Sequence, residues 1–267
     1  MRPPIFLGGA PRSGLTLLRA MLDSHPAIAC GPDLGLIAGL ARQYGEVAET
    51  IGTNLAAYYD LPEAEVRRHY RALIERLLSP LPLRRGKARA AEKSGANALF
   101  FRQLHALFPD SPLIHVIRDG RDVAASMLGR VWKGADGRPL PATRDLRSGA
   151  GLWAAMVKAG HAAGEECGTQ YLEIHYEDLV GAPEATLRRL CRFVGEEWDP
   201  MMLDYHCRPL TLVGTEADSP ALAQPLSRRF VGRWRRDLAA DEGAGLDAML
   251  APVLDAFGYR ESRRRSA

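Results

Sequence analysis

Residues 9–16 combine the side chains and the spacing of a site for a phosphate-like anion. Gly9 and Gly14 let the backbone approach an anion closely, and Arg12 between them adds a permanent, planar positive charge. Together with Thr16, the two glycines fit the spacing G-x-x-x-x-G-x-T of a phosphate-binding loop. Leu15 stands where such a loop carries the lysine that contacts the β- and γ-phosphates of a nucleoside triphosphate. The segment therefore predicts an anion cradle that uses arginine, in preference to an ordinary glycine-rich turn.

A second basic cluster follows the apolar segment 113–117. Arg118 ends that segment and Ser126 lies on the helix expected after it, so both side chains could face one ligand. They would form a second clamp for an anion, separate from the first. The alternative is structural: Arg118 pairs with Asp119 or Asp122, and Ser126 is an incidental helix residue. Taken by themselves, these residues favour the structural alternative.

Alternating strands and helices are predicted to position the two clusters. Apolar strands are expected at residues 5–7, 27–30, 113–117 and 171–176. Helices are expected at residues 17–24, 36–44, 61–78, 97–108, 123–130, 151–166, 183–194 and 246–257. The basic run 84–89 is expected to be a solvated loop. This order predicts a single α/β domain over residues 1–267, with a central parallel sheet and a short basic tail at about 261–267.

Composition excludes several classes of protein. A formal net charge of +3 and a pI near 8.7 are too mild for a nucleic-acid-binding protein, so no nucleic-acid partner is expected. The four cysteines are widely spaced and match no zinc pattern, which favours reduced thiols, a cytoplasmic location and no metal. No apolar run approaches the length of a membrane span and no signal peptide precedes the first strand.

The chain resembles the sulfotransferases that use 3′-phosphoadenosine 5′-phosphosulfate (PAPS), especially the protein-tyrosine sulfotransferase branch and its bacterial relatives. The strongest part is the ungapped stretch from Gly9 to Pro26, which reads G-x-P-R-S-G-x-T-L-x-R-A-M-L-D-x-H-P and is followed by Cys30-Gly31. A second motif, V-I-R-D-G-R, spans residues 116–121. Weaker matches are Lys93, the Y-E-D-L of residues 176–179 and the G-R-W of residues 232–234. Between residues 211 and 229 the resemblance is poor.

The resemblance implies a P-loop-like three-layer fold that transfers a sulfuryl group from PAPS to an acceptor hydroxyl by in-line displacement. The implied cradle for the 5′-phosphosulfate consists of Arg12, Ser13, Gly14, Leu15, Thr16 and Leu17. The implied residues for the 3′-phosphate are Arg118 and Ser126, with Arg130 and Arg228 or Arg229 as further candidates. Tyr176 would contribute to the cofactor pocket.

Three residues are implied in catalysis. Asp33 falls where close relatives carry the glutamate that acts as general base, and His25 is a less favoured substitute. Lys93 aligns with the lysine that stabilises the sulfuryl group, and Arg12 would stabilise developing charge as well. Without the resemblance, Asp33 would be assigned as a helix N-cap and Lys93 as a solvated loop lysine.

Two positions depart from the family pattern. Leu15 replaces the threonine usual in the phosphosulfate loop, although its backbone N–H is retained. The position near Ala91 lacks the cysteine expected to pair with Cys30, which favours a cytoplasmic enzyme of the bacterial type.

The sequence leaves two other functions open. A P-loop kinase or nucleotide hydrolase is disfavoured by Leu15, and a non-catalytic nucleotide-fold binding protein is disfavoured by the joint presence of the site residues. The acceptor (small molecule, glycan, lipid or peptide) is not identified, and its specificity is expected in loops 44–59 and 133–147. The oligomeric state is also open.

Overall fold

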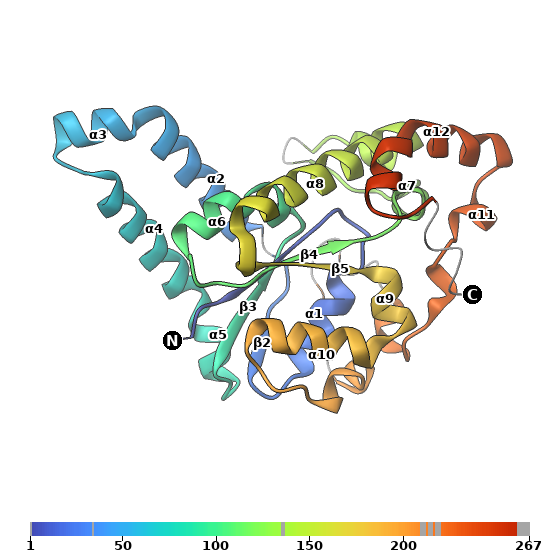
Figure 1. The fold of residues 1–267 in the computed structure, drawn as a ribbon, viewed down its shortest axis with the longest axis horizontal. Helices are drawn as coiled ribbons and strands as arrows, with labels where there is room; N and C mark the ends of the chain where they lie inside the picture. The colour runs from blue at the N-terminus through green and yellow to red at the C-terminus, as the bar shows by residue number, and fades with distance from the viewer. Residues whose placement is uncertain are drawn as a thin grey trace.

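The computed structural model describes residues 2–33, 35–134, 137–208, 212, 216 and 220–260. Its centre is a five-stranded sheet in the order β2-β3-β1-β4-β5, in which every neighbouring pair is parallel (Figure 1). The strands are β1 (Ile5–Gly8), β2 (Ile28–Cys30), β3 (Arg89–Lys93), β4 (Leu113–Ile117) and β5 (Tyr171–His175). The predicted α/β fold with a central parallel sheet is confirmed.

Helices connect the strands and continue after the last of them. They are α1 (Leu15–Ser24), α2 (Leu36–Glu46), α3 (Gly52–Tyr59), α4 (Glu63–Leu78), α5 (Pro80–Arg84), α6 (Phe101–Leu107), α7 (Gly120–Met127), α8 (Leu146–Cys167), α9 (Tyr176–Gly181), α10 (Pro183–Val194), α11 (Trp234–Asp237) and α12 (Ala240–Ala256). Each predicted helix is present, α10 with the predicted ends and the others with one or both ends shifted, whereas α3, α5, α9 and α11 were not expected. The tail predicted at 261–267 lies outside the described residues.

Successive side chains of β1 point into two different layers of the core, as the pleat of a strand requires. Ile5 and Leu7 are fully buried against α1 and α10, through residues such as Leu18 and Leu190. Phe6 faces the opposite layer, where it packs with Phe101 of α6. Figure 1 shows the two layers, with α6 and α8 on one face of the sheet and α1 and α10 on the other.

The carboxyl end of β1 is the point at which the chain changes direction across the sheet. From β1 the chain passes through α1 to β2 on one side, and after β3 it crosses to β4 on the other side of β1. In open parallel sheets, ligands bind in the crevice that such a switch creates beyond the carboxyl ends of the strands. The fold therefore places the predicted cradle, residues 9–16, in that crevice.

Strand β3 corrects one expectation from the sequence. The basic run 84–89 was predicted as a solvated loop, yet Arg89 begins β3 and is only 5% exposed. It donates to the carbonyl oxygens of Pro3 and Val194 and pairs with Glu196 at 3.4 Å. Its sequence, R-A-A-E-K, lacks the β-branched and aromatic residues typical of strands. Tertiary partners for the charged side chains decide this element, and these cannot be read locally.

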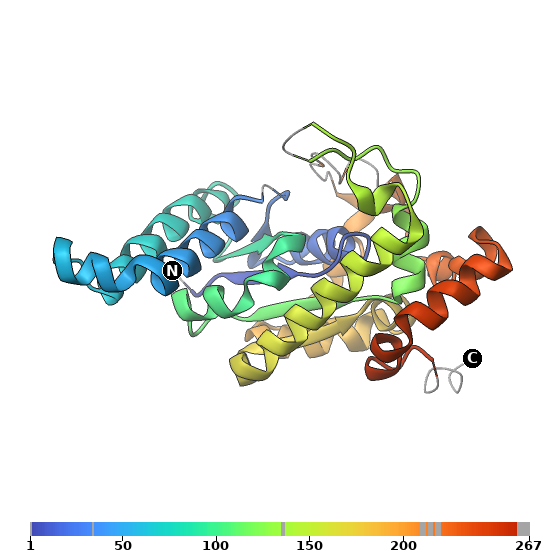
Figure 2. The same ribbon diagram turned by 90° about the horizontal axis from the view of Figure 1, so that it is seen from above.

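A second correction concerns the segment 44–59, which was predicted as a loop. The structure continues α2 into a π-helical turn (Val47–Ile51) and α3, and Leu55 packs toward the core beside α2, α4 and α6. The helices α2, α3 and α4 form an arm that projects from the body of the protein (Figures 1 and 2). Any acceptor specificity in this region would come from helices.

Candidate active site

The loop after β1 is shaped by two glycines that approach other backbone and ring atoms closely. Gly9 has φ +152°, and a Cβ there would collide with the carbonyl oxygen of Val116 on β4. Gly14 has φ +98°, and its Cβ would lie 2.6 Å from the ring of Tyr176. Any side chain at either position would therefore push the loop off β4 or off α9. Arg12 adopts a left-handed conformation with φ +67°, which is rare for a residue other than glycine and often marks a functional site.

This loop offers several hydrogen-bond donors to an anion. The N-cap of α1 is Gly14, so no N-cap side chain bonds to the first amides of the helix. The first turn of α1 also contains no acidic residue. The amides at that end have no partner inside the helix, and the helix dipole favours negative charge there. Ser13 is fully buried, and its Oγ has no hydrogen-bond partner among the described residues. A buried hydroxyl without a partner is costly unless a ligand satisfies it, so the cradle fits a phosphate or sulfate group.

Leu15, the residue that replaces the family threonine, faces the core. It is 6% exposed and belongs to the cluster around α1 and β1. The substitution therefore exchanges a hydroxyl for buried apolar surface, and the amide of Leu15 stays at the start of α1. Thr16 and Leu17 follow it in the first turn and are half-buried.

Arg118 and Ser126 both contact Arg12 of the cradle, so the clamp that was expected to be separate from the cradle adjoins it. Arg12 Nε donates to Ser126 Oγ over 3.1 Å, and Arg118 Nη1 donates to the carbonyl oxygen of Arg12 over 3.2 Å. The guanidinium of Arg118 stacks on the ring of Tyr176, with 4.4 Å between them. The structural alternative is also partly realised, because Arg118 pairs with Asp122 at 3.2 Å. The side chains of Arg12, Arg118 and Ser126 thus converge in one cluster, in which Arg118 and Ser126 are buried and Arg12 is half-buried.

The C-terminal segment brings a further arginine to this cluster. Arg233 Nη1 donates to Ser126 Oγ over 3.4 Å, and Arg118 Nη2 donates to the carbonyl oxygen of Phe230. Arg229, one of the two arginines chosen from the sequence, stacks on the ring of Phe230 at 4.6 Å and is exposed. In the sequence, the G-R-W of residues 232–234 is only a weak match to the family pattern. The contact with Ser126 makes Arg233 the better-placed C-terminal candidate for an anion.

The two remaining basic candidates lie at the edge of the cluster. Arg130 Nε donates to the backbone oxygen of Ser126 over 3.3 Å, which places it one helical turn beyond that residue. Arg228 is exposed, and its guanidinium lies about 4 Å from the position of a Cβ on Gly181 in α9.

Lys93 and Asp33 form an ion pair beyond the ends of β3 and β2. Lys93 Nζ lies 3.3 Å from Asp33 Oδ2 and 2.6 Å from Glu216 Oε1. The Lys93 side chain is 4% exposed, so it is no solvated loop lysine. Glu216 also pairs with Arg19 at 2.9 Å. No pattern in the sequence marks Glu216, which lies in the segment 211–229, where the resemblance to the family is poor.

Asp33 combines a structural contact with an accessible oxygen. Its Oδ1 accepts a hydrogen bond from the amide of Gly35 over 2.9 Å, which is the geometry of an Asx turn. The N-cap alternative is wrong in detail, because Gly35 is the N-cap of α2. The Asp33 side chain is 28% exposed, so it can meet both Lys93 and a molecule from solvent. The alternative base, His25, is 3% exposed and bonded to the Glu197 carbonyl and the Ala27 amide.

Glu92 is a buried acid next to this pair. Asn97 Nδ2 donates to Glu92 Oε2 over 2.6 Å and also to the carbonyl oxygen of Leu7. Burial raises the pKa of Glu92 to about 7, against the hydrogen bond from Asn97, and the charge of Asp33 contributes to the rise. Glu92 therefore changes its charge near neutral pH.

Glu92→Gln is expected to stabilise the protein more at pH 8 than at pH 5. A carboxyl whose folded pKa is raised from 4.5 to about 7 stabilises the fold fully only below pH 4.5 and loses that contribution as the pH rises to about 7. Above that pH, the free energy of unfolding of the variant relative to the wild type should be higher than at pH 5 by roughly 2–3 kcal/mol. Urea unfolding of both proteins at the two pH values measures this. An equal effect at both would contradict the raised pKa.

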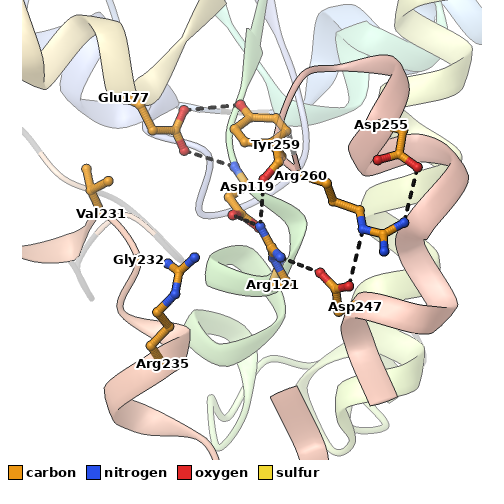
Figure 3. Close-up of a pocket in the computed structure, with 10 residues that line it drawn as sticks. All are labelled: Asp119, Arg121, Glu177, Val231, Gly232, Arg235, Asp247, Asp255, Tyr259 and Arg260. Carbon is orange, nitrogen blue, oxygen red and sulfur yellow. Dashed lines mark hydrogen bonds and ion pairs between the residues drawn. The ribbon is translucent and has the colours of Figure 1, made fainter. Parts of the chain in front are cut away.

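An ion-pair network behind the Arg118 turn secures the C-terminal helix to α7. Glu177 accepts from the amide of Asp119 over 3.0 Å and from the hydroxyl of Tyr259 over 3.1 Å. Arg121 bonds both oxygens of Asp119 and pairs with Asp247 of α12 (Figure 3). These residues line a pocket of about 470 Å³ whose acids and bases largely pair with one another. The network holds the turn that carries Arg118.

Comparison with known proteins identifies the family and agrees with the fold. A sequence profile of the Sulfotransferase family matches residues 3–200, so the chain belongs to that family and is an enzyme that transfers sulfate. Protein-tyrosine sulfotransferase A of Caenorhabditis elegans is 28% identical over 282 residues, which cover 96% of this chain and 67% of the relative. Protein-tyrosine sulfotransferase 1 of Danio rerio is 27% identical over 267 residues, which cover 96% of this chain and 72% of the relative.

Solved structures of sulfotransferases share the fold. The sulfotransferase domain from the curacin biosynthetic pathway superposes with a TM-score of 0.63 at 20% identity, over 94% of this chain and 98% of that domain. A mouse sulfotransferase complexed with PAP superposes with a TM-score of 0.51 at 15% identity, over 98% of this chain and 87% of that one. Within the described part of the chain, no helix has the length and apolar character to cross a bilayer.

Proposed function

We propose that this enzyme takes the sulfuryl group from PAPS and transfers it to an acceptor hydroxyl. The observation that carries the proposal is the pairing of two anion sites, the cradle of residues 9–17 and the cluster of Arg118, Ser126 and Arg233. A donor with a phosphosulfate and a separate 3′-phosphate needs two such sites. The mouse relative complexed with PAP, the product nucleotide of this donor, supports the same assignment. Leu15 in place of the Walker lysine disfavours a kinase or nucleotide hydrolase.

The residues of this chain have distinct tasks in the proposed reaction. PAPS would supply an activated sulfuryl group on a phosphate leaving group. The amides at the start of α1, with Ser13 Oγ, would hold the 5′-phosphate end, and Arg12 and Lys93 would stabilise negative charge as it develops. Asp33 would take the proton of the acceptor hydroxyl as general base. Burial raises the pKa of Tyr176, against the charge of Arg118, so its phenol stays neutral as a platform for Arg118.

The proposed acceptor is a hydroxyl compound, and the relatives suggest one candidate class. Both curated relatives are protein-tyrosine sulfotransferases by name, which makes a tyrosine side chain the first acceptor to test. We propose a reducing, cytoplasmic setting because Cys30 lies opposite Ala91 in the β2–β3 register and all four cysteines are free.

Calorimetric titration with adenosine 3′,5′-bisphosphate tests the donor class. The bisphosphate should bind more tightly than 5′-AMP by on the order of 2–4 kcal/mol, because only the former can use the Arg118 cluster. Magnesium-ATP serves as the rival ligand. Tighter binding of magnesium-ATP would overturn the proposal, and binding of neither nucleotide would favour a non-catalytic role.

Arg118→Ala should reduce the preference for the bisphosphate over 5′-AMP by about 10- to 100-fold, since a charge-assisted hydrogen bond is worth roughly 1.5–3 kcal/mol. The same titrations measure it. Arg233→Ala should act in the same direction, whereas Arg228→Ala should have a smaller effect because that side chain is exposed and lies near Gly181. Equal losses for both nucleotides would remove Arg118 from the 3′-phosphate.

A further inference from the structure

Glu216 is a buried carboxylate held between two buried cations at the transfer site. Its Oε1 lies 2.6 Å from Lys93 Nζ, and its Oε2 accepts from Arg19 Nη1 over 2.9 Å. The side chains of Glu216, Lys93 and Arg19 are 2%, 4% and 1% exposed. The three residues come from distant parts of the chain: the C-terminal segment, the end of β3 and the interior of α1.

The charges in this cluster depend on one another. Arg19 is on the face of α1 that packs against the core, where an unpaired cation would be strongly destabilising. Lys93 ends β3, which lies between β2 and β1 in the sheet, and would face the same penalty. Glu216 compensates both cations, and Asp33 adds a second negative charge beside Lys93. The cluster of Arg19, Lys93, Glu216 and Asp33 is therefore neutral.

The two carboxylates that contact Lys93 are not equivalent. Both oxygens of Glu216 face a cation, and its side chain is almost completely enclosed. Asp33 contacts Lys93 at the longer distance of 3.3 Å, is 28% exposed and is tied to Gly35 through its other oxygen. An anion that reaches Lys93 from solvent would therefore replace Asp33 and leave Glu216 in place.

We propose that Glu216 is a positioning residue that holds the Lys93 ammonium at the site of sulfuryl transfer. The contact between Glu216 and the ammonium is kept throughout. The contact between Asp33 and the ammonium is replaced by one with the anionic donor when the donor binds. The exchange frees Asp33 to act as the base at the moment when the site is filled. This inference rests on the proposed function and assigns a role to a residue in the segment with the poorest family resemblance.

Glu216→Gln tests the inference, because it removes the charge and keeps the size of the side chain. The variant should transfer sulfate from PAPS about 100-fold more slowly in a single turnover, since a catalytic group displaced by about 1 Å can cost that much. Affinity for adenosine 3′,5′-bisphosphate, which lacks the sulfuryl group, should change less than about threefold. In the protein without nucleotide, reductive methylation followed by mass spectrometry should label Lys93 several-fold faster in the variant.

Glu196→Gln is the matched control. Glu196 is 7% exposed and also lies between two arginines, Arg89 and Arg2, but it is remote from the transfer site. This variant reproduces the loss of a buried carboxylate and should leave the transfer rate and Lys93 labelling unchanged. If Glu216→Gln does not fold, Glu216→Asp can be used instead, because aspartate keeps the negative charge on a side chain that is shorter by one methylene. This variant should show a smaller loss of transfer rate and a smaller increase in Lys93 labelling.

A double-variant cycle with Lys93→Met separates positioning from a general structural role. In the Lys93→Met background, Glu216→Gln should cause no further loss of rate. A further loss as large as in the wild-type background, or faster transfer with tighter nucleotide binding in Glu216→Gln, would overturn the inference. Failure of the wild-type protein to use PAPS would instead refute the proposed donor, and the Lys93 labelling contrast would still report on the Glu216 contact.

Discussion

Asp33→Asn is expected to lower the rate of sulfuryl transfer by about 10²- to 10⁴-fold, the usual contribution of a general base. The amide has the size of the carboxylate and keeps an oxygen for the Gly35 amide, so the Asx turn before α2 should persist. It cannot take a proton from the acceptor hydroxyl. Single-turnover transfer from PAPS measures the rate, and calorimetry with adenosine 3′,5′-bisphosphate should give an affinity within about twofold of the wild type.

Asp199→Asn provides the control for this experiment. Asp199 Oδ1 accepts from the amide of Met201 over 2.8 Å in a similar turn. Its substitution should leave transfer unchanged. The assignment of Asp33 as the base fails if nucleotide affinity falls as much as the rate, or if the rate is retained.

Lys93→Met is expected to slow transfer by about 10²- to 10³-fold, the usual cost of removing one group that stabilises charge in the transition state. Methionine fills a similar volume without the ammonium. Because adenosine 3′,5′-bisphosphate has no sulfuryl group, its affinity should change less than about threefold, whereas affinity for PAPS should fall. The measurement pairs single-turnover rates with calorimetry for the product nucleotide.

Lys87→Met is the matched variant for this prediction. Lys87 is also largely buried, at 12% exposure, and donates to the backbone oxygens of Asp23 and Ile28. It should affect stability and leave transfer unchanged. A loss of product-nucleotide affinity as large as the loss of rate in Lys93→Met would place Lys93 at the phosphate instead of the sulfuryl group.

Local patterns in the sequence were sufficient for the strand–loop–helix at residues 5–24 and for the strands at 113–117 and 171–175. The strands at 5–8 and 113–117 are fully buried within the parallel sheet, and their largely apolar pattern is visible without a partner. Strand β3 was not predicted because its sequence, R-A-A-E-K, has no apolar pattern. Its charged residues Arg89 and Lys93 are stabilised by Glu196 and Glu216, which lie far away in sequence.

The candidate site also has one part that local sequence predicts and another part that depends on contacts between remote residues. Residues 9–16 were predicted as an anion cradle from adjacent residues alone, because the two glycines, Arg12 and the start of the helix lie close together in the sequence. Arg118 was likewise predicted at the end of a buried strand, and the parallel sheet brings the carboxyl ends of its strands to one edge. The contacts of Arg233 with Ser126 and of Glu216 with Lys93 are visible only in the three-dimensional structure. They join segments near the C-terminus to α7 and β3, and a contact between residues remote in sequence leaves no local pattern to read.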